Sequence, residues 1–175
     1  MDPEQVKILL IAGAVAAVGG AAGYYIARYL KGSITVSLPR TAFNPGEQIE
    51  GSFQLLTRKE VNGNNLTAVL VATETTRERG YNGKTRTRTR EIYRSGQTLE
   101  QARVYPAGYA ASYEFKIPVP AEQSLAGTDS ILGQALNMLN SFGRRISWKV
   151  EVRLDAEGVD LASSKGVTVN RPGLF

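Results

Sequence analysis

The opening stretch of the chain is the feature that most constrains its fold. Residues 8–27 read ILLIAGAVAAVGGAAGYYIA and contain no charged side chain. At a rise of about 1.5 Å per residue, about twenty helical residues span the roughly 30 Å hydrocarbon layer of a bilayer. The pattern therefore predicts a single transmembrane helix over residues 8–30, preceded by a short N-terminal tail, residues 1–7.

Small residues form two rows on this predicted helix. Gly13, Ala17 and Ala21 recur every four residues, and Gly19 and Gly23 form a second row. Rows of small residues allow two membrane helices to approach closely. They predict packing against a partner helix, although a weakly apolar span would contain many such residues in any case.

Aromatic and basic residues gather where the apolar run ends, namely Tyr24, Tyr25, Arg28, Tyr29 and Lys31. Tyrosine and basic side chains are enriched where a membrane helix meets the headgroups. A cleaved secretory signal is the alternative, because the run contains small residues that suit a cleavage site. Its preceding sequence, MDPEQVK, is more acidic than basic, whereas signal peptides begin with basic residues. We therefore expect the helix to be retained.

The charges around the span predict its orientation. Arg28, Lys31 and Arg40 follow one another after the run, and no acidic residue intervenes before Glu47. The positive-inside rule then places the N-terminus outside and residues 31–175 in the cytoplasm. The chain has no cysteine, which excludes a disulfide framework and leaves either compartment open.

The rest of the chain has the pattern of one mainly β domain over residues 33–170, followed by a C-terminal tail, residues 171–175. Apolar residues alternate with polar ones in short runs separated by turn residues such as Asn44-Pro45-Gly46 and Glu157-Gly158. Strands are predicted at 33–38, 48–57, 66–76, 84–94, 97–104, 109–117, 146–155 and 165–170. Eight short strands favour a single antiparallel, immunoglobulin-like β-sandwich, with a barrel as the alternative.

Both ends of this domain resemble an arrestin-like β-sandwich. Residues 34–55, ITVSLPRTAFNPGEQIEGSFQL, are similar to the opening strands, where a Pro-Gly-Glu loop precedes a strand entered by glycine. Residues 148–169, WKVEVRLDAEGVDLASSKGVTV, resemble the closing strands. The resemblance implies a non-catalytic domain that binds proteins, as in arrestins, retromer-type sorting subunits and sporulation-control proteins. The chain departs from arrestins in having one sandwich and a membrane helix, so no contact residue is transferred.

A basic hairpin is predicted around Asn82-Gly83, a dipeptide that suits a two-residue type I′ turn. In that register Arg79 faces Arg86 and Arg77 faces Arg88, while the neighbouring glutamates point the other way. Residues opposite each other or two apart share a face of a sheet. Five arginines are therefore expected on one face: Arg77, Arg79, Arg86, Arg88 and Arg90.

The charge of this hairpin indicates an anionic contact. Residues 77–94 contain seven basic and two acidic side chains, which matches the formal charge of +5 of the whole chain. Close to a bilayer, such a face favours anionic lipid headgroups or an acidic surface of a membrane partner. A solvated hairpin whose charges protect an exposed strand is the alternative. Nucleic acid is the weakest candidate, because only Tyr81 and Tyr93 interleave the basic residues.

An inserted amphipathic helix is predicted at about residues 128–142, where apolar residues adopt helical spacing. Thr128 or Asp129 can cap its start and Gly143 its end. Such a helix covers a sheet, docks a partner protein or lies on the bilayer. Its apolar stripe comprises Ile131, Leu132, Ala135, Leu136, Leu139 and Phe142.

The sequence offers no catalytic constellation. It has no histidine and no cysteine, so the commonest general base, thiol nucleophile and transition-metal ligands are missing. Asp155, Glu157 and Asp160 lie close together, but a calcium loop needs more oxygen ligands at fixed spacing. A polar turn is the preferred interpretation. We expect no catalytic residue, metal, cofactor or small-molecule substrate.

These features predict a non-catalytic accessory or scaffolding subunit of a larger integral-membrane complex. The small-residue helix would pack against partner helices, and the basic hairpin and inserted helix would contact protein or anionic lipid. The alternative is a membrane-anchored adaptor that recruits soluble cargo or binds anionic lipid, with the helix serving only as an anchor.

Overall fold

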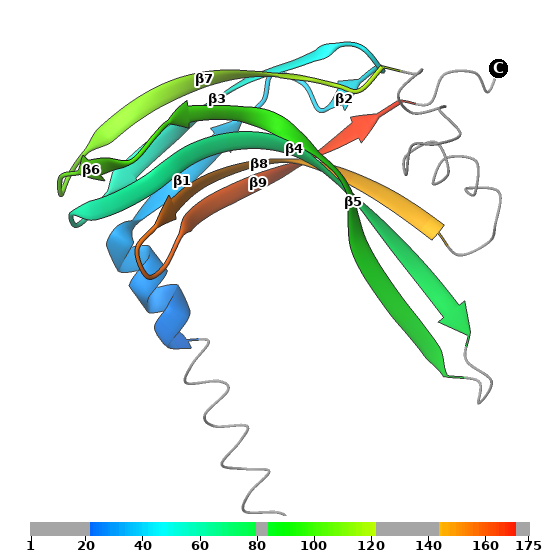
Figure 1. Ribbon diagram of the computed structural model, residues 1–175, viewed down its shortest axis with the longest axis horizontal. Coiled ribbons are helices and arrows are strands. Elements are labelled where there is room, and N and C mark those ends of the chain that lie inside the picture. The colour runs from blue at the N-terminus through cyan, green and yellow to red at the C-terminus, as the bar shows by residue number, and fades with distance from the viewer. Residues whose placement is uncertain (1–21, 80–83, 122–143, 171–175) are drawn as a thin grey trace, which may run out of the picture.

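The computed structural model describes residues 22–79, 84–121 and 144–170. Most of these residues lie in strands that form two sheets packed face to face (Figure 1). A short helix, residues 22–31, precedes the strands. The strands are β1 (Gly32–Ser37), β2 (Ala42–Phe43), β3 (Gln48–Thr57), β4 (Val61–Arg79), β5 (Thr85–Glu100), β6 (Arg103–Tyr105), β7 (Ala110–Pro118), β8 (Arg144–Ala156) and β9 (Leu161–Val169).

The smaller sheet has three antiparallel strands in the order β1-β3-β7. Its buried side chains occur at every second position, as Ile49, Phe53 and Leu55 do on β3 and as Phe115 and Ile117 do on β7. Successive residues of a strand point to opposite faces. One face of this sheet therefore packs into the core and the other is solvated.

The larger sheet has the order β2-β9-β8-β4-β5, and β6 adds to β4 beyond the end of β5. The β2–β9 pair is parallel and the other pairs are antiparallel. Strand β4 is its centre, because β5 and β8 pair with it on either side. Its buried residues Leu66, Ala68 and Leu70 face the smaller sheet as part of one core cluster. Ala72, the next residue on that face, is also buried. Tyr93 and Trp148, whose ring centroids are 5.7 Å apart, pack against that core.

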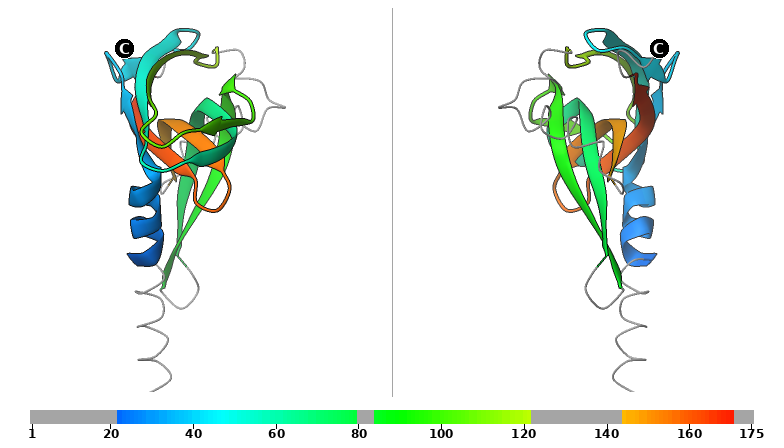
Figure 2. Two further views of the ribbon diagram at one scale, coloured as in Figure 1. Left: turned by 90° about the vertical axis from the view of Figure 1, so that its left-hand side faces the viewer. Right: turned by 90° about the vertical axis from the view of Figure 1, so that its right-hand side faces the viewer.

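The core ends along β4 shortly after Ala72. On the same face, the next residues are Glu74 and Thr76, which are polar. Packing of the smaller sheet against these polar side chains would be unfavourable, because burial of a polar group costs free energy. From this point the ends of β4 and β5 continue as a hairpin that extends away from the sandwich (Figures 1 and 2).

The prediction of an antiparallel sandwich is confirmed, but the two strands predicted at 84–94 and 97–104 are wrong. Strand β5 runs without a break from Thr85 to Glu100, and β6 follows as a separate short strand. Gly96 lies within β5. A Cβ atom at this position would overlap the Ala68 carbonyl oxygen and lie 2.6 Å from the Val69 Cα atom. The glycine thus permits close backbone approach rather than a turn.

Both predicted turns are present. At Asn44-Pro45-Gly46, the Glu47 amide donates to the Asn44 carbonyl at 3.1 Å, and Gly46 has a φ of 81°. This is the geometry of a type II turn, which requires a positive φ at its third residue. Gly158 also has a φ of 81° at the turn between β8 and β9.

Several predicted features lie outside the described residues. They include residues 8–21 of the apolar run, with Gly13, Ala17, Gly19 and Ala21, the inserted helix at 128–142 and the tail at 171–175. The part of the chain that the structure describes holds no helix with the length and hydropathy of a membrane span. The membrane helix therefore stays a prediction.

Candidate functional site

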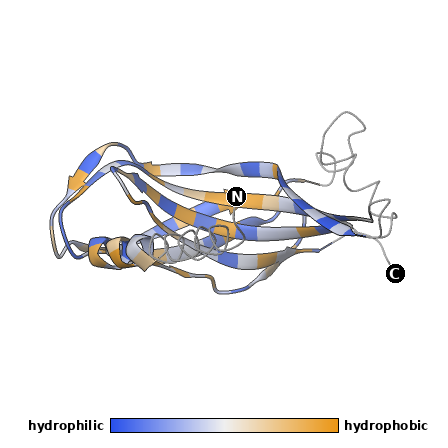
Figure 3. Cartoon of the chain, turned by 90° about the horizontal axis from the view of Figure 1, so that it is seen from below, coloured by the Kyte–Doolittle hydropathy of each residue, from blue (hydrophilic) through white to orange (hydrophobic). Residues whose placement is uncertain are grey.

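The helix of residues 22–31 exposes an unusual amount of apolar surface. Tyr24, Tyr25, Ile26, Tyr29 and Leu30 are 48% to 67% exposed. Elsewhere in the described residues, only two large hydrophobic side chains are classed as exposed. In Figure 3 this helix carries both hydrophobic and hydrophilic residues, as the strands do. A concentrated apolar surface of this kind indicates a contact with lipid or protein.

This helix joins the sandwich without a linker. Lys31 is its last residue, and Gly32 is the first residue of β1. A Cβ atom at Gly32 would overlap the Leu56 carbonyl oxygen and lie 3.0 Å from the Thr57 Cα atom. Only glycine fits between the helix and β3 here. We call residues 27–32, together with Arg58, the helix joint.

The Lys31 side chain ties the helix to the turn between β8 and β9. Its ammonium donates to the carbonyl oxygens of Glu157 at 2.7 Å and Val159 at 2.6 Å. The residue is only 5% exposed. Burial, reinforced by the nearby Lys59, lowers the pKa of Lys31 below its ordinary value of 10.5. Arg28 adds a further tie, since its guanidinium donates to the Ala162 carbonyl.

Arg58 closes the C-terminal end of the same helix. Its backbone amide donates to the Lys31 carbonyl at 2.9 Å, and its guanidinium donates to the Tyr29 carbonyl. The guanidinium also lies 4.2 Å from the centroid of the Tyr29 ring. The last carbonyls of a helix have no partner within the helix and carry partial negative charge. Arg58 satisfies two of them, which ties the helix end to the β3–β4 connection and offsets its partial negative charge.

A pocket of about 270 Å³ lies beside the helix joint. It is bounded by the helix, by the β3–β4 connection with the start of β4, and by the turn between β8 and β9. Its lining residues are Ala27, Lys31, Lys59, Glu60, Val61, Asn62, Glu157, Gly158 and Val159.

The second candidate region is the outer hairpin, residues 73–79 and 85–91, and its predicted register is wrong. Arg79 pairs with Thr85, Arg77 with Thr87 and Thr76 with Arg88. The register is thus shifted by one residue from the prediction, in which Arg79 faces Arg86. The predicted turn at Asn82-Gly83 lies outside the described residues.

This shift separates the predicted arginines. Arg86, Arg88 and Arg90 lie on the face that continues the core side of β4, whereas Arg77 is opposite Thr87 on the other face, and Arg79 pairs with Thr85. One row of three arginines replaces the predicted cluster of five. Its function as an anionic or partner contact stays a prediction.

Glu74 neutralises part of this row, contrary to the expectation that it points away. Arg90 and Glu74 are directly opposite, and the Arg90 Nε atom donates to the Glu74 carboxylate at 3.0 Å. The glutamate is buried, whereas the Arg90 side chain is 56% exposed. Arg88 lies opposite Thr76 and makes no ion pair with any other described residue.

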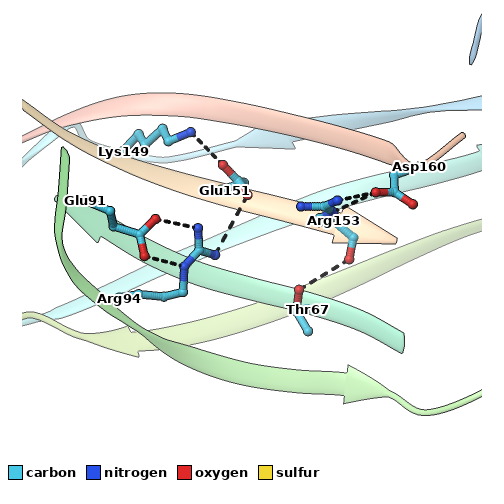
Figure 4. A network of polar contacts seen from close by, with 7 residues as sticks. All are labelled: Thr67, Glu91, Arg94, Lys149, Glu151, Arg153 and Asp160. Carbon is cyan, nitrogen blue, oxygen red and sulfur yellow. Dashed lines mark hydrogen bonds and ion pairs between the residues drawn. The ribbon is translucent and has the colours of Figure 1, made fainter. Parts of the chain in front are cut away.

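The outer face of the larger sheet carries charges that neutralise one another. Arg94 donates two hydrogen bonds of 2.8 Å to Glu91 and lies 3.9 Å from Glu151. This bonding leaves no unpaired charge in the network that could recruit a ligand. Figure 4 shows the residues involved: Thr67, Glu91, Arg94, Lys149, Glu151, Arg153 and Asp160.

Two of the three acidic residues around the turn between β8 and β9, Asp155 and Asp160, have protein partners. Asp160 binds the Arg153 guanidinium and accepts from the Ala156 amide at 3.1 Å, and Asp155 accepts from Asn64 at 3.3 Å. No group of three potential metal ligands occurs among the described residues. The carboxylates here serve to close the turn.

Comparison with known proteins identifies the fold. No family model matches this chain, and no curated protein matches it. Among solved structures, it resembles Spo0M, a sporulation control protein from Bacillus subtilis, with a TM-score of 0.55 and 12% sequence identity. The fold is an arrestin-like β-sandwich. The match covers 81% of this chain and 50% of Spo0M, and at this identity it shows the fold alone.

Sequence reasoning overlooked the helix joint and its pocket. The only local signal is Gly32, which stands where helical spacing gives way to the strand alternation of residues 33–38. Arg58 and Lys59 follow β3 without any pattern that would relate them to residues about thirty positions earlier. Their role depends on the pairing of β1 with β3, which brings Gly32 opposite Thr57.

Proposed function

We propose that this chain is a single-pass membrane protein whose arrestin-like sandwich is a non-catalytic accessory or scaffolding subunit of a larger integral-membrane complex. The observation that carries the proposal is the exposed apolar surface of residues 24–30, which adjoins the uncharged run of residues 8–27. Exposed tyrosines at the end of such a run suit the headgroup region of a bilayer. The span and its interface then account for surface that would otherwise face water.

The helix joint supports a scaffolding role. A sandwich that follows its membrane helix directly, with the connection fixed by Lys31, Gly32 and Arg58, has little freedom to swing. Its orientation relative to the bilayer is then set by the span. This suits a subunit that presents one defined surface to its neighbours better than a tethered domain that searches for distant partners.

The distribution of charge supports a cytoplasmic sandwich. Arg28, Lys31, Arg58 and Lys59 all lie at or beside the helix joint, on the side of the span that carries the domain. Lysine and arginine close to a span favour the cytoplasmic side. In this arrangement the N-terminus is outside and residues 31–175 are in the cytoplasm.

Small residues supply the contact with partner helices in this proposal. Gly23 is the member of the two rows that the structure describes, and a Cβ atom there would meet no other described atom within 4 Å. That side of the helix is therefore open to close approach by another helix. The remaining members of the rows, and the inserted helix as a docking element, stay predictions.

Replacement of Gly19 and Gly23 by leucine tests the scaffolding proposal. The full-length tagged chain is extracted gently in detergent, and the co-purifying subunits are identified by mass spectrometry. We expect the double variant to lose these subunits while it remains in membranes after alkaline extraction. Retention of all subunits by the variant would contradict packing through this row.

The matched control is Ala14→Leu with Ala22→Leu. It adds comparable bulk to the same run at positions that belong to neither small-residue row. We expect the control to retain the subunits. Loss of the subunits in both variants would show a general effect on the helix rather than a specific interface.

The second candidate function is an anchored adaptor that binds anionic lipid or recruits soluble cargo. It is favoured by the outer hairpin, which extends toward the same side of the sandwich as the helix (Figure 2). Exposed arginines on that hairpin would then lie close to the headgroups. Flotation of the full chain with vesicles that do or do not contain anionic lipid, before and after removal of the arginines, tests this function.

A further inference from the structure

The pocket beside the helix joint combines charges of both signs with few internal partners. Two lysines, Lys31 and Lys59, and two glutamates, Glu60 and Glu157, contribute to its lining. The four formal charges of this lining therefore cancel. A ligand that suits it must present both an anionic and a cationic group.

The Lys31 ammonium is held in place by backbone carbonyls rather than by a carboxylate. It makes two hydrogen bonds, to Glu157 O and Val159 O, and forms no ion pair with any described residue. A lysine ammonium has three donors, so one remains for a ligand. Its burial and the nearby Lys59 disfavour its positive charge and lower its pKa. An anion bound between the two lysines would relieve that disadvantage.

The two glutamates of the pocket, in turn, have no cationic partner among the described residues. The Glu60 and Glu157 side chains are exposed and form no ion pair with other described residues. The negative end of the helix does not compete for a cation, because Arg58 binds the carbonyls of Tyr29 and Lys31. Two carboxylates at the rim of the pocket therefore remain to accept hydrogen bonds from an ammonium group.

The pocket also touches the less exposed side of the helix, where Ala27 and Lys31 contribute to its lining. Ala27 and Lys31 are four residues apart and thus share one helix face. From Lys31 the helix runs away from the sandwich toward Ala22 (Figure 1). A ligand with a polar head in the pocket can lay an apolar tail along this helix. At about 270 Å³, the space is below the range of about 300–1,000 Å³ typical of drug-sized ligands, which suits a small headgroup.

We propose that this pocket binds the phosphoethanolamine headgroup of a membrane phospholipid, with the phosphate at Lys31 and Lys59 and the primary ammonium at Glu60 and Glu157. The inference rests on the proposed membrane attachment, because the lipid must reach the pocket from the bilayer. A headgroup without the ammonium leaves both glutamates without a partner. A bound lipid would also fix the sandwich at a defined height above the bilayer.

Native mass spectrometry of the full chain in detergent tests the proposal. The chain is titrated with phosphatidylethanolamine, phosphatidylglycerol or phosphatidylcholine of identical acyl chains, and the retained lipid is measured. We expect about tenfold tighter retention of phosphatidylethanolamine than of phosphatidylglycerol, since charge-assisted hydrogen bonds to both ends are required. Equal retention of all three lipids would overturn the proposal.

Variants test the proposed phosphate contact at the lysines separately from the proposed ammonium contact at the glutamates. Lys59→Gln should weaken retention of both phosphatidylethanolamine and phosphatidylglycerol, whereas Glu60→Gln with Glu157→Gln should remove the preference between them. The control is Glu50→Gln with Lys116→Gln, an exposed ion pair between β3 and β7, which should change neither. Unchanged lipid retention in the Lys59 and glutamate variants would overturn the assignment to this pocket.

Two further measurements distinguish the sources of failure. Soluble glycerophosphoethanolamine and inorganic phosphate are titrated in the same detergent, and binding of either as tight as that of the lipid would replace the lipid by a free phosphate ligand. Alkaline extraction of membranes reports attachment independently of the pocket. An extractable chain would contradict the proposed membrane function, and a firmly attached chain without lipid selectivity would contradict the pocket alone.

Discussion

The helix of residues 22–31 and the outer hairpin extend from the sandwich toward the same side (Figures 1 and 2), but they are attached to it in different ways. At the joint, Lys31 donates to backbone carbonyls of the turn between β8 and β9, Gly32 lies against the backbone of β3, and Arg58 donates to carbonyls of the helix. In the outer hairpin, the core side of the sheet has become polar, and the Arg90–Glu74 pair is its main described tie. The joint fixes the orientation of the sandwich relative to the helix, whereas the hairpin carries exposed charge. Substitutions in the joint should therefore change stability, and substitutions in the hairpin should change binding.

Gly32→Val should have the largest effect on stability of the substitutions in the two regions. The new side chain would overlap the Leu56 carbonyl, and Gly32 also has a φ of 155°, which valine rarely adopts. We expect the free energy of unfolding to fall by about 3 kcal/mol. Chemical denaturation of the full chain in detergent measures it. Gly166→Val is the control, because a Cβ atom there meets no other described atom within 4 Å; a similar loss in both variants would contradict the close approach at Gly32.

Lys31→Met tests the polar part of the joint. The substitution keeps much of the side-chain length but removes the donors to the Glu157 and Val159 carbonyls, so we expect a loss of about 2 kcal/mol. Lys116→Met removes an exposed ion pair with Glu50 and should cost less than about 0.5 kcal/mol. Denaturation curves of both variants provide the measurement. Equal effects would mean that the joint is no more tightly held than the surface.

Glu74→Gln tests how the outer hairpin is tied to the sheet. The change removes the charge that Arg90 binds at 3.0 Å, and we expect a local loss of about 1 kcal/mol. Hydrogen exchange of the amides of residues 85–90 should accelerate about fivefold, while amides of β3 stay unchanged. Glu91→Gln, which breaks a more exposed pair with Arg94, is the control. Equal acceleration by both variants would contradict a special role for the buried carboxylate.

The sequence predicts much of the sandwich, because alternation along β1, β3 and β7 reflects burial of one face. It predicts the turns at Gly46 and Gly158 for the same reason, since a positive φ there is a local requirement. Gly32 and Gly96 are different. Their glycines are needed because a strand distant in sequence passes close to the backbone, which no local pattern reveals.

The arginine row also depends on pairing between strands that a local sequence pattern does not determine. Period two correctly places Arg86, Arg88 and Arg90 together, because they are on one strand. Their relation to Arg77 depends on the register across the hairpin, and a shift of one residue moves a side chain to the opposite face. The dipeptide Asn82-Gly83 alone does not determine that register.

Arg86→Ser with Arg88→Ser should have the smallest effect on stability and thereby sharpens the contrast. Both residues are exposed, so we expect a change within about 0.5 kcal/mol in the free energy of unfolding. If the hairpin reaches anionic headgroups, each cation contributes about 1 kcal/mol, and two removed charges should weaken vesicle binding at least about tenfold. Flotation with anionic vesicles measures this binding. Arg103→Ser, which removes a cation beside Tyr105 and Tyr109, is the control. Unchanged flotation in the hairpin variant would remove lipid from the candidate partners and leave an acidic protein surface or a solvated hairpin.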